Sequence, residues 1–168
     1  MLRKVILTLI IFFGFIFQCS VLNYISLGGI VPNILLIITA SFGFMRGQNE
    51  GMAVGFLCGI LVDIFFGNVF GFYTICYVLI GYLNGFFKNI FYPEDIKLPL
   101  LLITVSEIVY CMICYIFRFL LRGRLAFGYY FVHIILPEIV YTILATLLIY
   151  KGIVILNEWL EDIERRNA

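Results

Sequence analysis

The chain has 168 residues, 64% of them hydrophobic and 12% charged, with a net charge of +1 at pH 7. A soluble domain is about half apolar and about a quarter charged, so this chain cannot cover itself with a polar surface and lipid must be its solvent. The balanced charge and the lack of a basic stripe exclude a nucleic-acid partner. We predict an all-α, polytopic membrane helix bundle of about six transmembrane helices.

Apolar runs define the expected helices, and they occupy residues 5–25, 30–45, 51–66, 69–87, 98–120 and 128–150. A bilayer crossing needs about 20 residues, a length that the first, fourth, fifth and sixth runs reach. The second and third runs are about 16 residues long, so we expect them to cross only if they are packed inside the bundle. Five helices, or a re-entrant pair, remain as alternatives.

The basic residues give the expected orientation. The first run follows Arg3 and Lys4 and lacks a small-residue cleavage site, so it is typical of an uncleaved signal anchor. With both termini inside the cell, most basic residues fall on the cytoplasmic side, namely Arg3, Lys4, Arg46, Lys88, Lys97, Lys151, Arg165 and Arg166. The loop that contains Arg118, Arg122 and Arg124 argues against this N-in, C-in topology, because it places three basic residues on the outer side. This loop could dip into the interface or bind an anionic group.

Small residues recur at every fourth position along the third run, at Gly51, Gly55 and Gly59, and the series ends at Asp63. A step of four residues drifts by about 40° around a helix, so these positions share one broad face, where small residues let helices approach closely in lipid. Gly67 and Gly71 fall in the turn that follows. We expect a packing face or partner contact here, with Asp63 near the outer end of the helix accepting hydrogen bonds from the Gly67–Asn68 turn.

Two acidic residues, Glu107 and Glu138, lie near the middle of the fifth and sixth runs. Because these runs form neighbouring antiparallel helices, the two carboxyls are expected to meet at similar depth, either as interhelical hydrogen bonds or as part of a proton or ion pathway. Their candidate partners are Tyr110, Tyr141, His133, Asn84 and Gln18. Pro137 should kink the sixth helix beside Glu138.

The last residues change in character and divide the chain into a transmembrane bundle, 1–150, and a cytoplasmic juxtamembrane amphipathic tail, 151–168. Apolar residues of the tail recur at helical spacing, at Ile153, Leu156, Leu160 and Ile163. The tail could be a solvated extension of the last helix along the membrane, or a docking face for a cytoplasmic partner.

The inventory of reactive side chains argues against an enzyme. Ser106 and His133 lack a glycine-flanked nucleophile motif, and Asp95 and Asp162 lie in polar segments outside the membrane spans. Cys111 and Cys114 have redox spacing, but they fall inside an apolar run and are read as small apolar residues. We therefore predict no catalytic residue, no cofactor, no metal and no disulfide.

Two motifs carry a family resemblance. The segment "VPNILLII" (31–38) contains Pro32 and Asn33, and "GFLCGILVDIFFGNVFG" (55–71) contains Gly55, Gly59, Asp63, Gly67 and Gly71. The chain resembles the MreD family of bacterial rod shape-determining membrane proteins, in which a Pro-Asn pair opens a short helix and a similar Gly/Asp pattern follows. The chain length, the six apolar runs and the basic N-terminus also fit.

The resemblance implies a non-catalytic scaffold of the cell-elongation machinery in the bacterial cytoplasmic membrane. Its implied partners are an MreC-like bitopic protein, an MreB-like actin homologue, and a RodA-like glycan polymerase with its transpeptidase, besides membrane lipids. We hypothesise in addition that the Asp63 end of the third helix helps to make the contact with the MreC-like partner.

An alternative function is the substrate-binding subunit of an energy-coupling-factor vitamin transporter, which also has six short helices. Such subunits usually carry an alanine-x3-alanine pair on the first helix, where this sequence offers only Gly14, Cys19 and Ser20.

Overall fold

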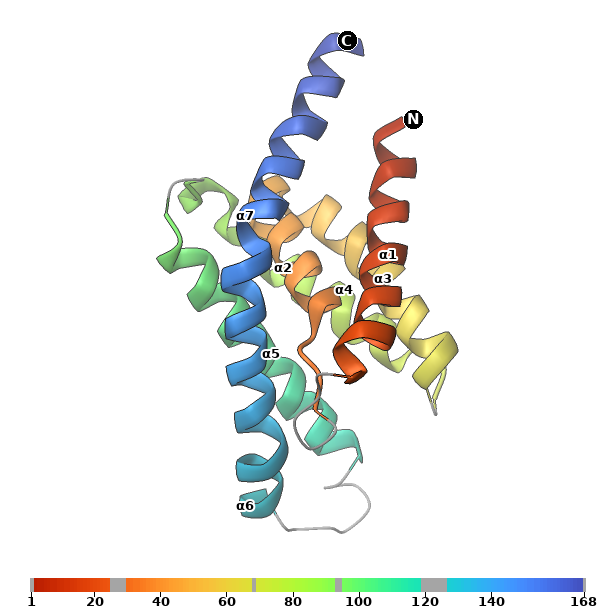
Figure 1. Cartoon of the computed structure of the whole chain (residues 1–168), viewed down its shortest axis with the longest axis vertical. Coiled ribbons are helices and arrows are strands. Elements are labelled where there is room, and N and C mark those ends of the chain that lie inside the picture. Colours follow the sequence, from red (N-terminus) through yellow and green to blue (C-terminus); the bar gives the residue numbers. More distant parts are fainter. Residues whose placement is uncertain (1, 25–29, 68, 93–94, 119–126, 168) are drawn as a thin grey trace.

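A computed structural model describes residues 2–24, 30–67, 69–92, 95–118 and 127–167, most of which are helical and none of which forms a β-sheet (Figure 1). The expected all-α bundle of six helices is confirmed. Its elements are α1 (Leu2–Tyr24), α2 (Ile34–Arg46), α3 (Gln48–Phe66), α4 (Phe72–Gly85) with a 3-10 turn (Phe86–Ile90), and α5 (Lys97–Arg118). The sixth helix comprises α6 (Phe127–Tyr130), a π-helical turn (Phe131–Ile135) and α7 (Leu136–Asn167).

Helix lengths differ from the lengths of the apolar runs. Three described stretches are long and apolar enough to cross a membrane, and they lie in α3 (Gln48–Phe66), in α5 (Lys97–Phe117) and in the sixth helix (Gly128–Ile163). The apolar stretches within α1 (Lys4–Ser20) and α2 (Ile34–Arg46) are shorter. The third helix is longer than expected because it begins at Gln48. The fourth run was expected to reach full length, but α4 has 14 residues, or about 21 Å. The helix ends at Gly85, where the chain tightens into the 3-10 turn.

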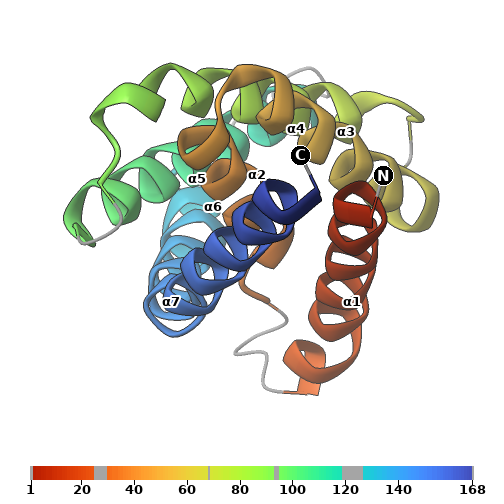
Figure 2. The ribbon, with the colours of Figure 1, turned by 90° about the horizontal axis from the view of Figure 1, so that it is seen from above.

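The short helix α2 lies at the centre of the molecule. Every residue from Ile34 to Met45 is buried, and α1, α3, α4, α5 and α7 all contact this helix. An α-helix that is apolar on all sides needs such complete burial. Because its neighbours enclose α2, this helix of 13 residues does not have to span the bilayer by itself. Viewed from above, α1 and α7 stand on the same side of the bundle (Figure 2), and both chain termini lie at one end of the molecule (Figure 1).

Helices α3 and α4 pack so closely that side chains are excluded between them. A Cβ atom built on Gly55 would lie 2.4 Å from the carbonyl oxygen of Tyr77, and one on Gly51 would lie 2.4 Å from the carbonyl oxygen of Gly81. On the opposite helix, a Cβ on Gly81 would lie 2.1 Å from the carbonyl oxygen of Gly51. The two backbones therefore touch directly, as small residues permit between helices in lipid.

The turn between α2 and α3 consists of Gly47 alone. Its φ of 105° lies in a region that side chains with a Cβ rarely adopt, so glycine is required there. This single-residue connection keeps the two helices side by side.

The C-terminal segment continues α7 without a break at residue 150. On the amphipathic face predicted from the sequence, Ile153 and Leu160 are buried and Leu156 is partly buried against the hydrophobic core. This face is thus already covered within the chain. The division into a bundle (1–150) and a tail (151–168) stays a prediction.

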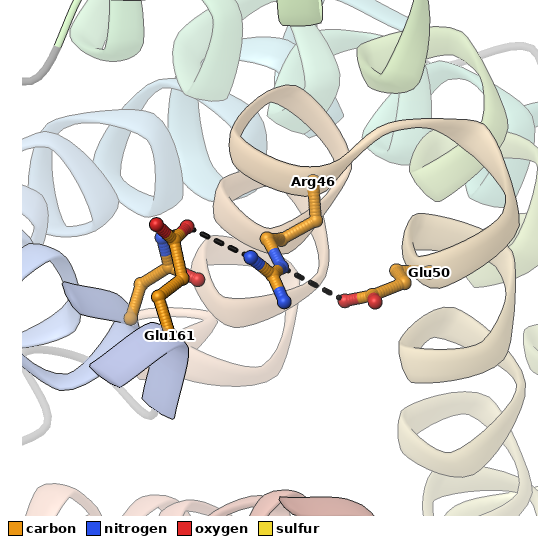
Figure 3. A network of polar contacts seen from close by, with 4 residues as sticks. Arg46, Glu50 and Glu161 are labelled. Carbon is orange, nitrogen blue, oxygen red and sulfur yellow. Dashed lines mark hydrogen bonds and ion pairs between the residues drawn. The ribbon is translucent and has the colours of Figure 1, made fainter. Parts of the chain in front are cut away.

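An ion-pair network fastens this segment to the bundle (Figure 3). The Arg46 guanidinium donates to Glu161 Oε1 at 2.8 Å and to Glu50 Oε2 at 3.4 Å, and Asn157 Nδ2 donates to the same Glu161 oxygen at 3.1 Å. One arginine thereby links the end of α2, the first turn of α3 and the last turns of α7. The side chains of the segment 118–126, with Arg118, Arg122 and Arg124, lie outside the described residues.

Replacing Gly55 by alanine should destabilise the protein. Alanine favours a helix by up to about 1 kcal/mol over glycine, but overpacking against the Tyr77 carbonyl costs about 1–3 kcal/mol. We expect a lower thermal midpoint in detergent for Gly55→Ala. Gly152→Ala is the matched control, because a Cβ there meets nothing within 4 Å. Equal midpoints for the two variants would contradict the close packing.

Removing the charge at position 161 should loosen the last turns of α7. A partly exposed ion pair contributes about 0.2–1 kcal/mol, so Glu161→Gln should raise amide hydrogen exchange over residues 151–167 by up to about fivefold. Glu158→Gln, at an exposed position on the same helix, should leave exchange unchanged. Identical exchange in the two variants would show that the Arg46 network does not hold this segment.

Candidate functional site

The carboxylate of Asp63 caps the start of α4 from the neighbouring helix. Asp63 lies on α3 and is 3% exposed. Its Oδ1 accepts from the backbone nitrogen of Tyr73 at 3.1 Å, and its Oδ2 accepts from the backbone nitrogen of Thr74 at 2.8 Å and from the Thr74 hydroxyl. These amides belong to the second and third residues of α4, which a helix cannot satisfy internally.

The cap is supplied across helices because the residue at the usual capping position is Gly71, which has no side chain. A carboxylate at a helix N-terminus both accepts hydrogen bonds and interacts favourably with the helix dipole. The sequence suggested instead that the Asp63 side chain would accept from the following turn. The turn is bonded through the backbone, since the Gly67 nitrogen donates to the Asp63 carbonyl at 3.0 Å. Asn68 lies outside the described residues.

Asn33 joins three helices. Its Oδ1 caps α2 by accepting from the Leu36 nitrogen at 3.2 Å, and it also accepts from the Tyr77 hydroxyl at 2.7 Å. Its backbone nitrogen donates to the Thr142 hydroxyl of α7 at 3.3 Å. Pro32, which precedes it, is buried. The sequence pointed to the start of a helix at this position, but nothing in it identified Tyr77 or Thr142 as contacts.

A cavity of about 340 Å³ lies beside Asn33, between residues of α1, α3, α4, α5 and α7. Polar and aromatic side chains share its wall with apolar ones. The lining residues are Phe15, Gln18, Cys19, Val31, Asn33, Val62, Phe66, Tyr73, Tyr77, Tyr110 and Glu138. The size is within the range of about 300–1,000 Å³ typical of small-molecule pockets. Tyr73 and Tyr77 were missed by sequence reasoning, because tyrosines at helical spacing resemble ordinary core residues.

Glu107 and Glu138 lie together with Cys111. The carboxyl oxygens and the sulfur are all within 4.8 Å of one another, and Cys111 Sγ lies 3.6 Å from Glu138 Oε2. Glu107 is fully buried, whereas Glu138 is partly buried and reaches the cavity.

Three of the candidate partners for these carboxyls bond elsewhere. Gln18 Oε1 accepts from the Leu35 nitrogen, Asn84 Nδ2 donates to Ser106 Oγ, and a ring nitrogen of His133 contacts the Tyr129 carbonyl oxygen. Ser106 is thus bonded to Asn84, and exposed His133 stacks on Tyr129. Among the residues that the structure describes, no serine and histidine are arranged as a nucleophile and its base.

Six helices, three of which can cross a membrane, and outer faces bearing large apolar side chains define a small helical membrane protein. The family model described as rod shape-determining protein MreD matches residues 1–158. This chain belongs to the MreD family, so the resemblance seen in the sequence is confirmed, and with it a role in rod shape determination. Neither a curated protein nor a solved structure matches the chain.

Removing the Asp63 carboxylate should destabilise α4. Loss of a cap costs about 0.5–2 kcal/mol, and here it leaves the amides of buried Tyr73 and partly buried Thr74 without an acceptor. We expect Asp63→Ala to lower the thermal midpoint in detergent, and Asp63→Asn, which retains one acceptor oxygen, to lower it less. Asp162→Ala is the control, since that carboxylate is exposed. A midpoint for Asp63→Ala equal to that of the control would refute the capping role.

Proposed function

We propose that this protein is a non-catalytic scaffold of the cell-elongation machinery and spans the cytoplasmic membrane several times with both termini inside. It would link an MreC-like bitopic protein, and through it an MreB-like actin homologue, to a RodA-like glycan polymerase and its transpeptidase. Membership of the MreD family over residues 1–158 is the observation that carries this proposal. The position of both termini at one end of the molecule supports the topology (Figure 1).

The family motif supports an architectural function. Gly51, Gly55 and Gly59 face α4, and the Asp63 carboxylate is bonded to the first turn of α4. The motif therefore fixes the position of one helix on another. Buried residues of this kind act on a partner by shaping the surface that it meets, rather than by touching it.

The packed pair of α3 and α4 presents the outer face of α3 to a partner in the membrane. Exposed residues follow one another at helical spacing on this face, at Ala53, Phe56, Leu57 and Ile64. Asp63 and the glycines hold this face in place from behind. We propose it as the contact for the transmembrane helix of the MreC-like partner.

Co-purification with the MreC-like partner tests the proposal. Truncating two exposed side chains, Leu57→Ala with Ile64→Ala, should reduce recovery of the partner roughly tenfold if about 1.4 kcal/mol of contact is lost. The control truncates two exposed leucines of α7, Leu144→Ala with Leu148→Ala, and should retain the partner. Asp63→Ala and Gly59→Leu should also weaken recovery, because they displace α3 relative to α4, while membrane insertion continues. Normal recovery in all of these variants would overturn the proposal.

The cavity is the observation that favours the vitamin-transporter alternative. Its volume of about 340 Å³ and its polar contributions from Gln18 and Asn33 would suit a small molecule. Tight binding of a vitamin by the purified protein, together with normal cell shape on its depletion, would favour that alternative over the scaffold.

A further inference from the structure

The cluster of Glu107, Cys111 and Glu138 has the composition of a metal site. Glu107 and Cys111 are four residues apart on α5, so their side chains project from the same face of that helix. Glu138 approaches them from the first turn of α7. The three ligand atoms lie within 4.8 Å of one another, and a bound ion would require the two longer glutamate side chains to move slightly toward the Cys111 sulfur.

The surroundings of Glu107 are a second reason to expect a bound cation in this cluster. The residue is 0% exposed, and neither of its carboxyl oxygens has a hydrogen-bond partner among the described residues. A buried polar group without a partner costs free energy, and a buried carboxylate costs still more. Protonation would remove the charge and let Glu107 share its proton with the nearby Glu138 carboxyl, but the second oxygen of Glu107 would still lack a partner within the described part of the chain. A divalent cation shared with Glu138 would offset the charges of the two carboxylates and occupy their oxygens together.

The backbone before Glu138 is shaped for this approach. Residues Phe131–Ile135 form a π-helical turn, in which the Leu136 nitrogen donates to the Phe131 carbonyl five residues earlier. Such turns occur often at functional sites, and here the wider turn accommodates Pro137, which has no amide hydrogen to donate. The turn sets the rotation of α7 just where Glu138 enters the cluster.

We propose that Glu107, Cys111 and Glu138 bind a divalent transition-metal ion of the zinc class. Zn²⁺ accepts both thiolate and carboxylate ligands, whereas Ca²⁺ and Mg²⁺ prefer oxygen ligands alone. On binding, the Cys111 thiol gives up its proton to solvent, so one thiolate and two carboxylates hold the ion and the buried charge falls from −2 for the two carboxylates to −1 for the loaded site. Because Glu138 also lines the cavity, the cavity offers a route for the ion, and a fourth ligand can approach from that side.

Metal binding by the purified, chelator-treated full chain tests this site. We expect roughly one Zn²⁺ per chain after desalting, measured by elemental analysis, and a thermal midpoint that rises with added Zn²⁺. Co²⁺ in place of Zn²⁺ should give the near-ultraviolet charge-transfer absorption of a cobalt–thiolate bond, which reports directly on a sulfur ligand.

Three variants remove one ligand each, Glu107→Gln, Glu138→Gln and Cys111→Ser, and each should weaken Zn²⁺ binding at least about tenfold. Cys114→Ser is the matched control, since Cys114 is a buried cysteine on the same helix outside the cluster, and it should bind as the unmodified chain does. Failure of the unmodified chain to take up Zn²⁺ would overturn the proposal. So would unchanged binding by Cys111→Ser or Glu107→Gln, or the absence of the cobalt–thiolate absorption.

Discussion

Direct backbone contact between α3 and α4 is the constraint on which the rest of the structure depends. Because a Cβ at Gly55 or Gly59 would overlap the opposite helix, the two axes come closer than larger side chains allow. This proximity brings the Asp63 carboxylate within reach of the first amides of α4. The paired helices also form part of the enclosure around α2, which is too short to cross a bilayer by itself.

Helix ends must find hydrogen-bond partners within the protein when the solvent is lipid. At the start of α2, Gln18 accepts from Leu35 and Asn33 accepts from Leu36. At the start of α4, the same need is met by Asp63. Gln18 therefore fixes α2 relative to α1, and Asp63 fixes α4 relative to α3. In addition, the Tyr77 hydroxyl brings α4 to Asn33.

The buried carboxyls of this protein are in contrasting environments. Asp63 accepts hydrogen bonds from two amides and one hydroxyl, which accounts for its burial structurally. Glu107 is equally buried, yet its oxygens lack hydrogen-bond partners among the described residues and face a second carboxyl and a thiol. Hydrogen bonds from the backbone therefore account for the burial of Asp63 but not for that of Glu107. The cation proposed for the Glu107 cluster would supply the partner that the backbone supplies to Asp63.

Hydrophobic composition and six apolar runs were enough to predict the lipid solvent and the all-α bundle, and the Pro-Asn and Gly/Asp motifs carried the resemblance to the MreD family. The solvent and the helices follow from local periodicity and from the cost of exposing apolar or polar groups to the wrong solvent. The sequence did not show that Asp63 bonds to Thr74, that Asn33 bonds to Tyr77, or that Cys111 joins Glu107 and Glu138. These contacts link different helices or depend on which face of a helix turns inward, so only the tertiary packing decided them.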